Sequence, residues 1–271
     1  MSSLGNEATI ATCLAGGMQG SDVPTTRGGI QSISRAAAVL KELSQSPQGR
    51  SVLDLAMATG LDRTTVHRLV RTLATTGLVE ARGAIYRVGP TCLALGLARI
   101  NSLNLREAAL PYAVDLQQSV VKNRPFIVSL SAAAIDEVVI IDRIWTPAVP
   151  LNIIMGIGWR FPIDETVSGR AMLATLSDAE IDARLGYERR KRLMERLTAI
   201  RERDGLEWGM GEFHAGVGTI ACPLLGTDGT AVGAIIVAGL EMEAELNQYS
   251  DLSQSLRRSA QMISRLLKGS G

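Results

Sequence analysis

Residues 63–76 carry arginine and threonine side chains at a spacing that could bind nucleic acid. On a helical wheel the apolar side chains gather within about 60° of one another: Val66, Leu69, Val70 and Leu73. The opposite side collects Thr64, Arg68, Arg71, Thr72 and Thr75, with no acidic residue. Arginine can bind guanine or a phosphate, and threonine can bind a phosphate or contact a thymine methyl group. The pattern predicts a helix that reads DNA, although a solvated helix with spare positive charge has the same pattern.

The segments before this helix have their own start and stop signals. Residues 32–45 repeat apolar side chains every three or four positions, which predicts a first helix. Ser51 and Asp54 resemble a capping box that opens a short second helix, which Gly60 closes. Asp62 is the expected N-cap of the third helix.

After Gly77 the apolar period falls from 3.6 to 2, which is typical of strands. Residues 78–81 and 84–88 flank Arg82-Gly83 and predict a β-hairpin. Three helices followed by a hairpin form a winged helix-turn-helix, and this context favours DNA over the solvated-helix alternative.

The predicted contacts to a double-stranded DNA operator lie on the third helix and at the hairpin tip: Arg63, Thr64, Thr65, His67, Arg68, Arg71, Thr72 and Arg82. His67 lies at the edge of the exposed side, where it packs beside the core or contacts a phosphate rather than a base. Arg82 either enters the minor groove or lies in solvent.

Charge is distributed unevenly along the chain of 271 residues, whose net charge is only +1. Residues 27–90 hold nine lysines and arginines against four acidic residues, whereas residues 107–271 hold seventeen against twenty-one. This asymmetry suggests a nucleic-acid contact in the first part and a different task in the second.

Composition excludes several other classes of protein. The longest apolar run, Ala231 to Leu240, is too short to span a bilayer, and the N-terminus lacks the basic flank of a signal peptide. Three cysteines and two histidines allow neither a disulfide framework nor a Cys/His metal cluster. We therefore expect a cytoplasmic protein with no membrane contact, no metal and no cofactor.

The periodicity divides the chain into a flexible tail (1–29), a DNA-binding domain (30–90), a linker helix (91–105) and a larger domain (106–271). In the last we expect a helix over 106–121, strands over 126–131, 138–144, 151–155, 217–225 and 231–238, and helices over 168–176, 178–185, 189–203 and 244–267. The mixture indicates an α+β fold with helices packed on a sheet.

The chain resembles the IclR family of bacterial transcriptional regulators. In the first domain the resemblance rests on residues 31–35, 55–61, 64–73, 77–80 and 86–90, including Thr64-Thr-Val-His-Arg. In the second it rests on residues 162–174, 211–223 and 228–234, including Gly211-Glu-Phe-His. It implies a winged helix-turn-helix, a linker helix and a GAF-like effector-binding domain with an antiparallel sheet. It also implies repression or activation controlled by a small molecule, commonly an organic acid, and a homodimer or homotetramer.

The resemblance also implies an effector pocket, in which this chain departs from acid-binding relatives. Ile236 and Ala238 replace serines on the last strand, Trp208-Gly-Met210 replaces a segment with an aspartate, and Thr219 replaces a cysteine. Fewer polar partners predict a larger, aromatic or partly apolar acid. Its acceptor group is expected near Ser168 and Gly169. The predicted effector residues are Trp145, Trp159, Asp164, Val167, Ser168, Gly169, Trp208, Thr219, Ile236 and Ala238. The alternative is that these side chains face the core and the pocket lies elsewhere.

Other function classes have weaker support. Neither a phosphate-binding Gly-x-x-x-x-Gly-Lys nor a Gly-x-Ser-x-Gly nucleophile motif occurs. Glu212, His214 and Cys222 could bind zinc, but Glu-x-His alone is a weak signal. We therefore predict a protein that is not an enzyme. The alternative is a GAF-like ligand-sensing or protein-interaction module whose winged helix does not act on DNA.

Overall fold

The computed structural model describes residues 29–102 and 104–269, so nearly all of the predicted tail lies outside the described residues. The chain divides into two compact units, Met1–Arg99 and Ile100–Gly271. The division falls inside the helix predicted as a linker, and each unit is described by itself.

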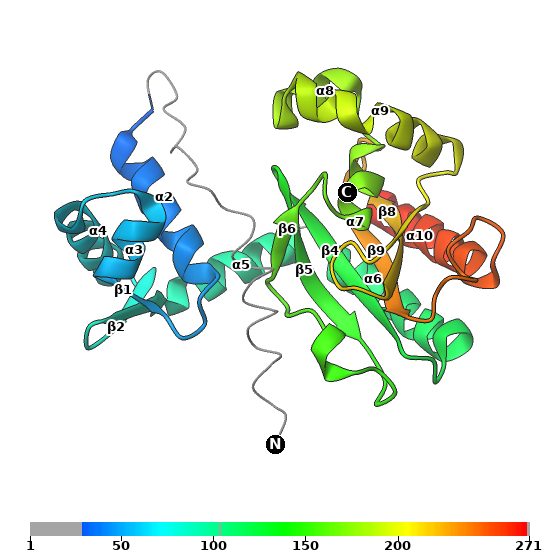
Figure 1. The fold of residues 1–271 in the computed structure, drawn as a ribbon, viewed down its shortest axis with the longest axis horizontal. Helices are drawn as coiled ribbons and strands as arrows, with labels where there is room; N and C mark the ends of the chain where they lie inside the picture. Colours follow the sequence, from blue (N-terminus) through cyan, green and yellow to red (C-terminus); the bar gives the residue numbers. More distant parts are fainter. Residues whose placement is uncertain (1–28, 103, 270–271) are drawn as a thin grey trace. The chain divides into compact units, whose positions relative to one another are not determined.

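The first unit is a winged helix-turn-helix, as predicted (Figure 1). Its elements are α2 (Gln31–Ser44), β1 (Arg50–Ser51), α3 (Val52–Thr59), α4 (Arg63–Thr75), β2 (Val79–Arg82) and β3 (Ile85–Val88). The strands pair in the order β1-β3-β2, all antiparallel. Two-residue β1 is too short to be read from periodicity.

Side-chain caps fix where α3 and α4 begin. The capping box of Ser51 and Asp54 forms as predicted, and Gly60 ends α3 with a φ of 68°. At α4, Asp62 Oδ1 accepts a hydrogen bond from the Thr65 N–H at 2.8 Å. Side-chain hydrogen bonds from Ser51 and Thr65 respectively lower the pKa values of Asp54 and Asp62. The turn between α3 and α4 is therefore set by local chemistry.

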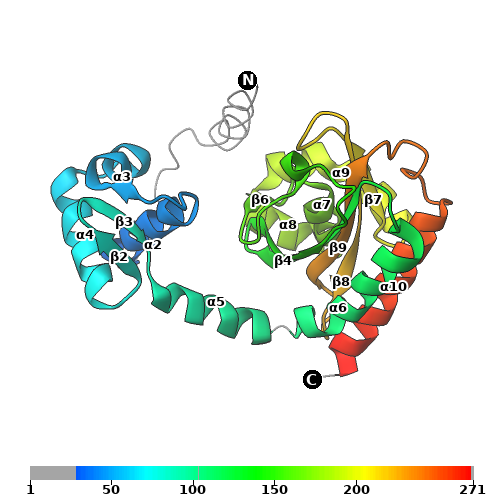
Figure 2. The ribbon, with the colours of Figure 1, turned by 90° about the horizontal axis from the view of Figure 1, so that it is seen from below.

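The helix after the hairpin, α5 (Pro90–Ser102), corresponds to most of the linker helix predicted over 91–105, whose last residue already belongs to the next helix (Figure 2). The second unit then opens with α6 (Leu105–Leu116), which contains Pro111, and continues as a π-helix, η1 (Gln117–Val121). Pro111 is accommodated within this helix.

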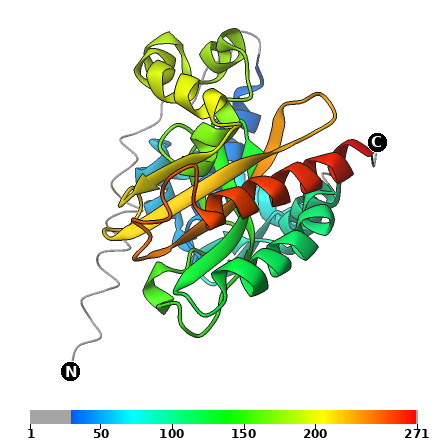
Figure 3. The ribbon, with the colours of Figure 1, turned by 90° about the vertical axis from the view of Figure 1, so that its right-hand side faces the viewer.

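A six-stranded antiparallel sheet forms the centre of the second unit, in the order β6-β5-β4-β9-β8-β7. Its strands are β4 (Phe126–Ala134), β5 (Glu137–Ile144), β6 (Arg160–Pro162), β7 (Glu207–Met210), β8 (Val217–Leu225) and β9 (Ala231–Leu240). The helices on it are α7 (Val167–Leu173), α8 (Asp178–Leu185), α9 (Tyr187–Glu202) and α10 (Asp251–Gly269). Figure 3 shows α10 and α6 side by side along the sheet.

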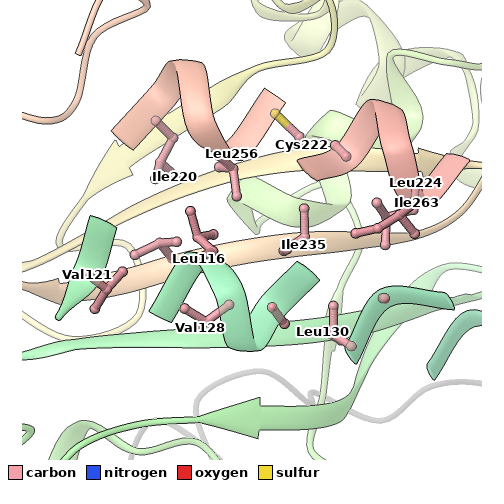
Figure 4. Packing of buried hydrophobic residues seen from close by; sticks show 14 of the residues in the cluster. Leu116, Val121, Val128, Leu130, Ile220, Cys222, Leu224, Ile235, Leu256 and Ile263 are labelled. Carbon is pink, nitrogen blue, oxygen red and sulfur yellow. The ribbon is translucent and has the colours of Figure 1, made fainter. Parts of the chain in front are cut away.

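Each face of this sheet has its own apolar core. Helices α6 and α10 cover one face, where Val128, Leu130 and Ile235 pack against Leu116 and Leu256 (Figure 4). Helices α7, α8 and α9 contribute to the core on the other face, which contains Ile140, Ala221 and Ile236. Side chains alternate between the two faces along each strand.

Most predicted elements differ from the structure by three residues or fewer at their ends, but two predictions differ by more. The strand expected over 151–155 is a short 3-10 helix, η2 (Leu151–Ile153), because the Ile153 N–H bonds to the Pro150 carbonyl within the turn. The last helix begins at Asp251 instead of near 244, because Asn247 and Ser250 hold the preceding residues in turns. Strands β6 and β7 were not predicted.

Candidate DNA-binding face and effector site

Helix α4 turns its polar side to solvent. Val66, Val70 and Leu73 are buried in the core of the first unit, and Leu69 packs against them. The predicted DNA-contacting residues that are exposed on α4 are Arg63, Thr64, His67, Arg68, Arg71 and Thr72. Thr65 is half-buried beside its cap.

The arginines on this side are unpaired. In the described part of the chain, no ion pair or hydrogen bond engages the guanidinium groups of Arg63, Arg68 and Arg71. Such groups can bind phosphate or guanine without first breaking an internal contact. Thr72 differs, since its hydroxyl donates to the Arg68 carbonyl at 3.0 Å and must leave that bond before it can donate to a phosphate.

The hairpin tip carries an ion pair that sequence reasoning did not anticipate. Arg82 Nε lies 3.2 Å from Glu80 Oε1, and both side chains are largely exposed. Exposed pairs contribute about 0–1 kcal/mol, so a phosphate could replace Glu80 at little cost. Whether Arg82 enters the minor groove or lies in solvent on the operator is not tested by this ion pair, and its DNA contact stays a prediction.

In the second unit, we call the side of the sheet covered by α7 the α7 face. Ser129 lies directly opposite both Arg143 of β5 and Ile236 of β9, and residues in such pairs share a face. By the same register Thr219 and Ala238 form a pair two residues further along β8 and β9. The predicted effector residues that lie on or pack against this face are Trp159, Val167, Ser168, Gly169, Thr219, Ile236 and Ala238.

Trp208 does not belong to the α7 face, so the structure places it apart from the predicted effector residues Thr219, Ile236 and Ala238. It lies opposite Ile220 and packs against the core beneath α6 and α10. The guanidinium of Arg203 lies 4.3 Å from its ring centre. Because strand residues alternate, its neighbours Glu207 and Gly209 occupy the α7 side instead.

Two further predicted contacts are already occupied within the protein. Asp164 forms an ion pair with Arg189 through both carboxylate oxygens, with Arg189 Nε at 2.8 Å from Oδ2, and this hydrogen bond raises the pKa of Arg189. The Gly169 N–H donates to Thr166 Oγ1 at 3.1 Å. The Gly169 N–H of the expected acceptor site is therefore already engaged within the protein. Trp145 is 41% exposed, with the Arg143 guanidinium 5.1 Å from its ring centre.

A network of charges beside α7 was missed by sequence reasoning. Arg170 is almost fully buried, and its Nε lies 2.9 Å from Glu207 Oε1 and its Nη2 2.5 Å from Glu212 Oε1. Arg196 Nε lies 2.6 Å from the same Glu207 oxygen. Burial lowers the pKa of Arg170, but hydrogen bonds to Glu212 and Glu207 outweigh it and give a net rise. These partners come from separate elements, so periodicity could not have paired them.

The Glu212 carboxylate also lies close to the backbone of Gly209. A β-carbon on Gly209 would lie 2.4 Å from Glu212 Oε1. The carboxylate thus fills the space beside the strand that a side chain at Gly209 would need.

Three aromatic rings meet at one edge of the site. Phe161 and Phe213 lie 4.8 Å apart in a T-shaped arrangement, and Trp159 lies 6.5 and 6.3 Å from them. Phe213 is 38% exposed. The sequence predicted only Trp159 in this place.

Unpartnered polar atoms also collect near the α7 face. Among the described residues, buried side-chain atoms without a hydrogen-bond partner include Ser131 Oγ, Arg143 Nε and Thr146 Oγ1. They belong to β4, β5 and the segment after β5. Such groups are uncommon in folded proteins.

Two hollows lie away from the predicted effector residues. One, of about 650 Å³, is lined by Glu80, Val88, Gly89, Pro90, Cys92 and Leu93. The other, of about 240 Å³, lies beside α10, with Cys222 and Arg257 in its lining. Cys222 is fully buried, and burial raises the pKa of its thiol. No group of three or more His, Cys, Asp or Glu side chains suited to a metal occurs in the described residues.

Comparison with known proteins agrees with this two-unit architecture. The family model described as "Bacterial transcriptional regulator IclR C-terminal" matches residues 97–265, and "IclR helix-turn-helix domain" matches residues 32–83. The HTH-type transcriptional regulator TtgV of Pseudomonas putida is 30% identical over 237 residues, which cover 83% of this chain and 86% of the relative.

Solved structures show the same fold. A transcriptional regulator from Rhodococcus sp. RHA1 is 30% identical, with a TM-score of 0.65, covering 90% of this chain and 100% of that one. An IclR transcriptional regulator from Silicibacter sp. TM1040 is 23% identical, with a TM-score of 0.74, covering 88% of this chain and 96% of that one.

The two units define a transcriptional regulator with a DNA-binding domain and a ligand-binding domain, and not an enzyme. The chain belongs to the IclR family. Regulators of this family bind DNA operators and small-molecule effectors and form oligomers. Within the described residues, no helix is both long and apolar enough to cross a membrane.

Proposed function

We propose that this protein is a cytoplasmic, homodimeric or homotetrameric regulator that binds its operator through α4 and the β2–β3 hairpin. An aromatic or partly apolar organic acid, bound on the α7 face, controls that binding. The observation that carries the DNA assignment is the row of exposed, unpaired arginines on α4: Arg63, Arg68 and Arg71.

The chemistry of the α7 face supports the class of effector. Ile236 and Ala238 are buried apolar side chains on this face, and Trp159, whose ring lies 6.3 Å from that of Phe213, packs against the cluster that contains Ile236. A small hydrophilic acid would find few hydroxyl partners there, whereas a ring gains by leaving water and by contact with other rings.

The test uses the full chain and a labelled DNA fragment from the region upstream of its own gene. Fluorescence anisotropy should show tight binding that weakens as salt rises, because phosphate contacts release counterions. Substituted benzoates should change this affinity more than pyruvate or glyoxylate. DNA binding with no response to any acid would support the proposed operator binding and refute the proposed control by an organic acid.

The variant Ile236→Ser tests the site itself. It should reduce the preference for benzoates over pyruvate, because it gives a hydrophilic acid a partner and the ring a poorer wall. Ile236→Val is the matched control, since it keeps an apolar side chain, and it should retain the preference. Equal preferences in parent and serine variant would place the effector elsewhere.

A further inference from the structure

Arg143 is held on the α7 face by contacts that leave part of its guanidinium unsatisfied. Its Nη1 donates to the Met155 carbonyl, and its guanidinium lies 5.1 Å from the Trp145 ring centre. Its Nε is buried and has no hydrogen-bond partner among the described residues. No carboxylate there forms an ion pair with it.

The other arginines around α7 have no such free capacity. Arg170 and Arg196 share Glu207 and Glu212, and Arg189 holds Asp164. Arg143 therefore differs from them in carrying a positive charge on this face without a carboxylate beside it.

The unsatisfied hydroxyl of Ser131 belongs to the same face. Ser131 is fully buried on β4, two residues from Ser129, which lies directly opposite Arg143. A β-bulge between Leu130 and Ser131 shifts the register, so Ser131 lies opposite Ile140 of β5, and Ile140 belongs to the core on the α7 face. Leaving a buried donor unpaired is unfavourable, and more so for a charged group, so such atoms are uncommon in folded proteins.

We infer that Arg143 binds the carboxylate of the effector, with Ser131 as a second donor, and that the ring of the same molecule lies against Ile236 and Ala238. This inference rests on the proposed function, whose effector site it extends. A guanidinium and a carboxylate form charge-assisted hydrogen bonds of matching geometry, which explains why one cation can replace several hydroxyl partners. It also moves the anchor from the start of α7, where the Gly169 N–H is occupied, to β5.

Isothermal titration of the full chain with benzoate, benzamide and pyruvate tests this assignment. The parent should bind benzoate more tightly than neutral benzamide. Arg143→Met keeps an unbranched apolar stem and removes the charge, and it should weaken benzoate binding about 10- to 100-fold while leaving benzamide binding nearly unchanged. Arg143→Lys should fall between parent and Arg143→Met, because an ammonium keeps the charge but not the fork. Arg192→Met is the matched control, since Arg192 is exposed on α9.

Each result decides a different point. Equal benzoate affinities in parent and Arg143→Met overturn the role of Arg143 and leave the aromatic-acid proposal standing. Equal affinities of the parent for benzoate and benzamide overturn it as well, and this comparison needs no folded variant. A parent that binds pyruvate but not benzoate, or binds none of the three, overturns both this inference and the proposed class of effector.

Discussion

The arginines of this chain divide by whether a carboxylate lies beside them. Arg170 is enclosed and shares two glutamates with Arg196. Arg68 and Arg71 are exposed to solvent, and neither forms an ion pair with a carboxylate among the described residues. The first arrangement serves the stability of the second unit, and the second leaves charge available for a polyanion.

The buried pair of Arg170 and Glu207 predicts a non-additive effect on stability. Arg170→Met should lower the free energy of unfolding by about 3–5 kcal/mol, because it leaves buried carboxylate charge with fewer partners. Arg170→Met combined with Glu207→Leu should recover much of that loss. Urea unfolding of the full chain, followed by tryptophan fluorescence, measures both. Strictly additive losses would show that the pair is not the cause.

The unpaired arginines predict an effect on DNA affinity alone. Arg68→Ala and Arg71→Ala should each weaken operator binding, by about 1–3 kcal/mol where the side chain reads a base. The melting temperature of each variant should equal that of the parent, because both side chains point away from the core. Arg192→Ala on α9 removes the same charge from the other unit and should bind as the parent does. Parent-like binding by both α4 variants would mean that another element reads the operator.

The starts of α3 and α4 depend on carboxylates whose pKa values are lowered, those of Asp54 and Asp62. Asp62 caps α4, and the Thr65 side chain and backbone are the main causes of its lowered pKa. A group whose pKa is lower in the folded state stabilises the fold above its unfolded pKa of about 3.9, and this contribution is lost as pH falls through the folded value.

Asp62→Ala should therefore lower the melting temperature of the parent near neutral pH, because α4 loses its cap. The difference between variant and parent should shrink as the pH falls below about 4, where the parent's own carboxylate takes up a proton. Differential scanning calorimetry over this pH range measures it, with exposed Asp251→Ala as a second acidic variant. A difference independent of pH would assign the effect to something other than the carboxylate.

Local signals account for what could be predicted about these elements. The caps at Ser51 and Asp62 and the glycine at 60 act within a few residues, so the sequence alone placed α3 and α4. Residues 151–155 have strand-like composition, but no strand partner reaches them, and a turn forms instead. The face to which Trp208 points depends on the register of β7 with β8, which no short stretch of sequence encodes. The same holds for the charge network around Arg170.

We expect assembly to depend on α5, which exposes large apolar side chains to solvent. Leu93 is 67% exposed and Leu97 50% exposed, and both lie on the side of the helix that includes Ile100. A palindromic operator requires two DNA-binding domains at a fixed spacing. Apolar side chains on a connecting helix are suited to hold two copies together.

Leu93→Glu combined with Leu97→Glu should shift the full chain toward monomer and weaken operator binding, because charge replaces the apolar contact. Leu95→Glu introduces the same charge on another side of α5, where the side chain is 59% exposed, and should leave the assembly intact. Multi-angle light scattering at micromolar concentration separates these outcomes. A monomeric parent, with and without DNA, would refute the assembly.

The two outer strands of the six-stranded sheet are its shortest. β6 has three residues and ends at Pro162, and β7 has four and contains Gly209. A sheet edge exposes unpaired N–H and C=O groups onto which a stray chain can add, and short edges with proline or glycine give such a chain little to pair with. A protein that forms a defined oligomer must also prevent unspecific strand pairing at the edges of its sheets. The brevity of β6 and β7 thus protects the folded chain against aggregation through the edges of its sheet.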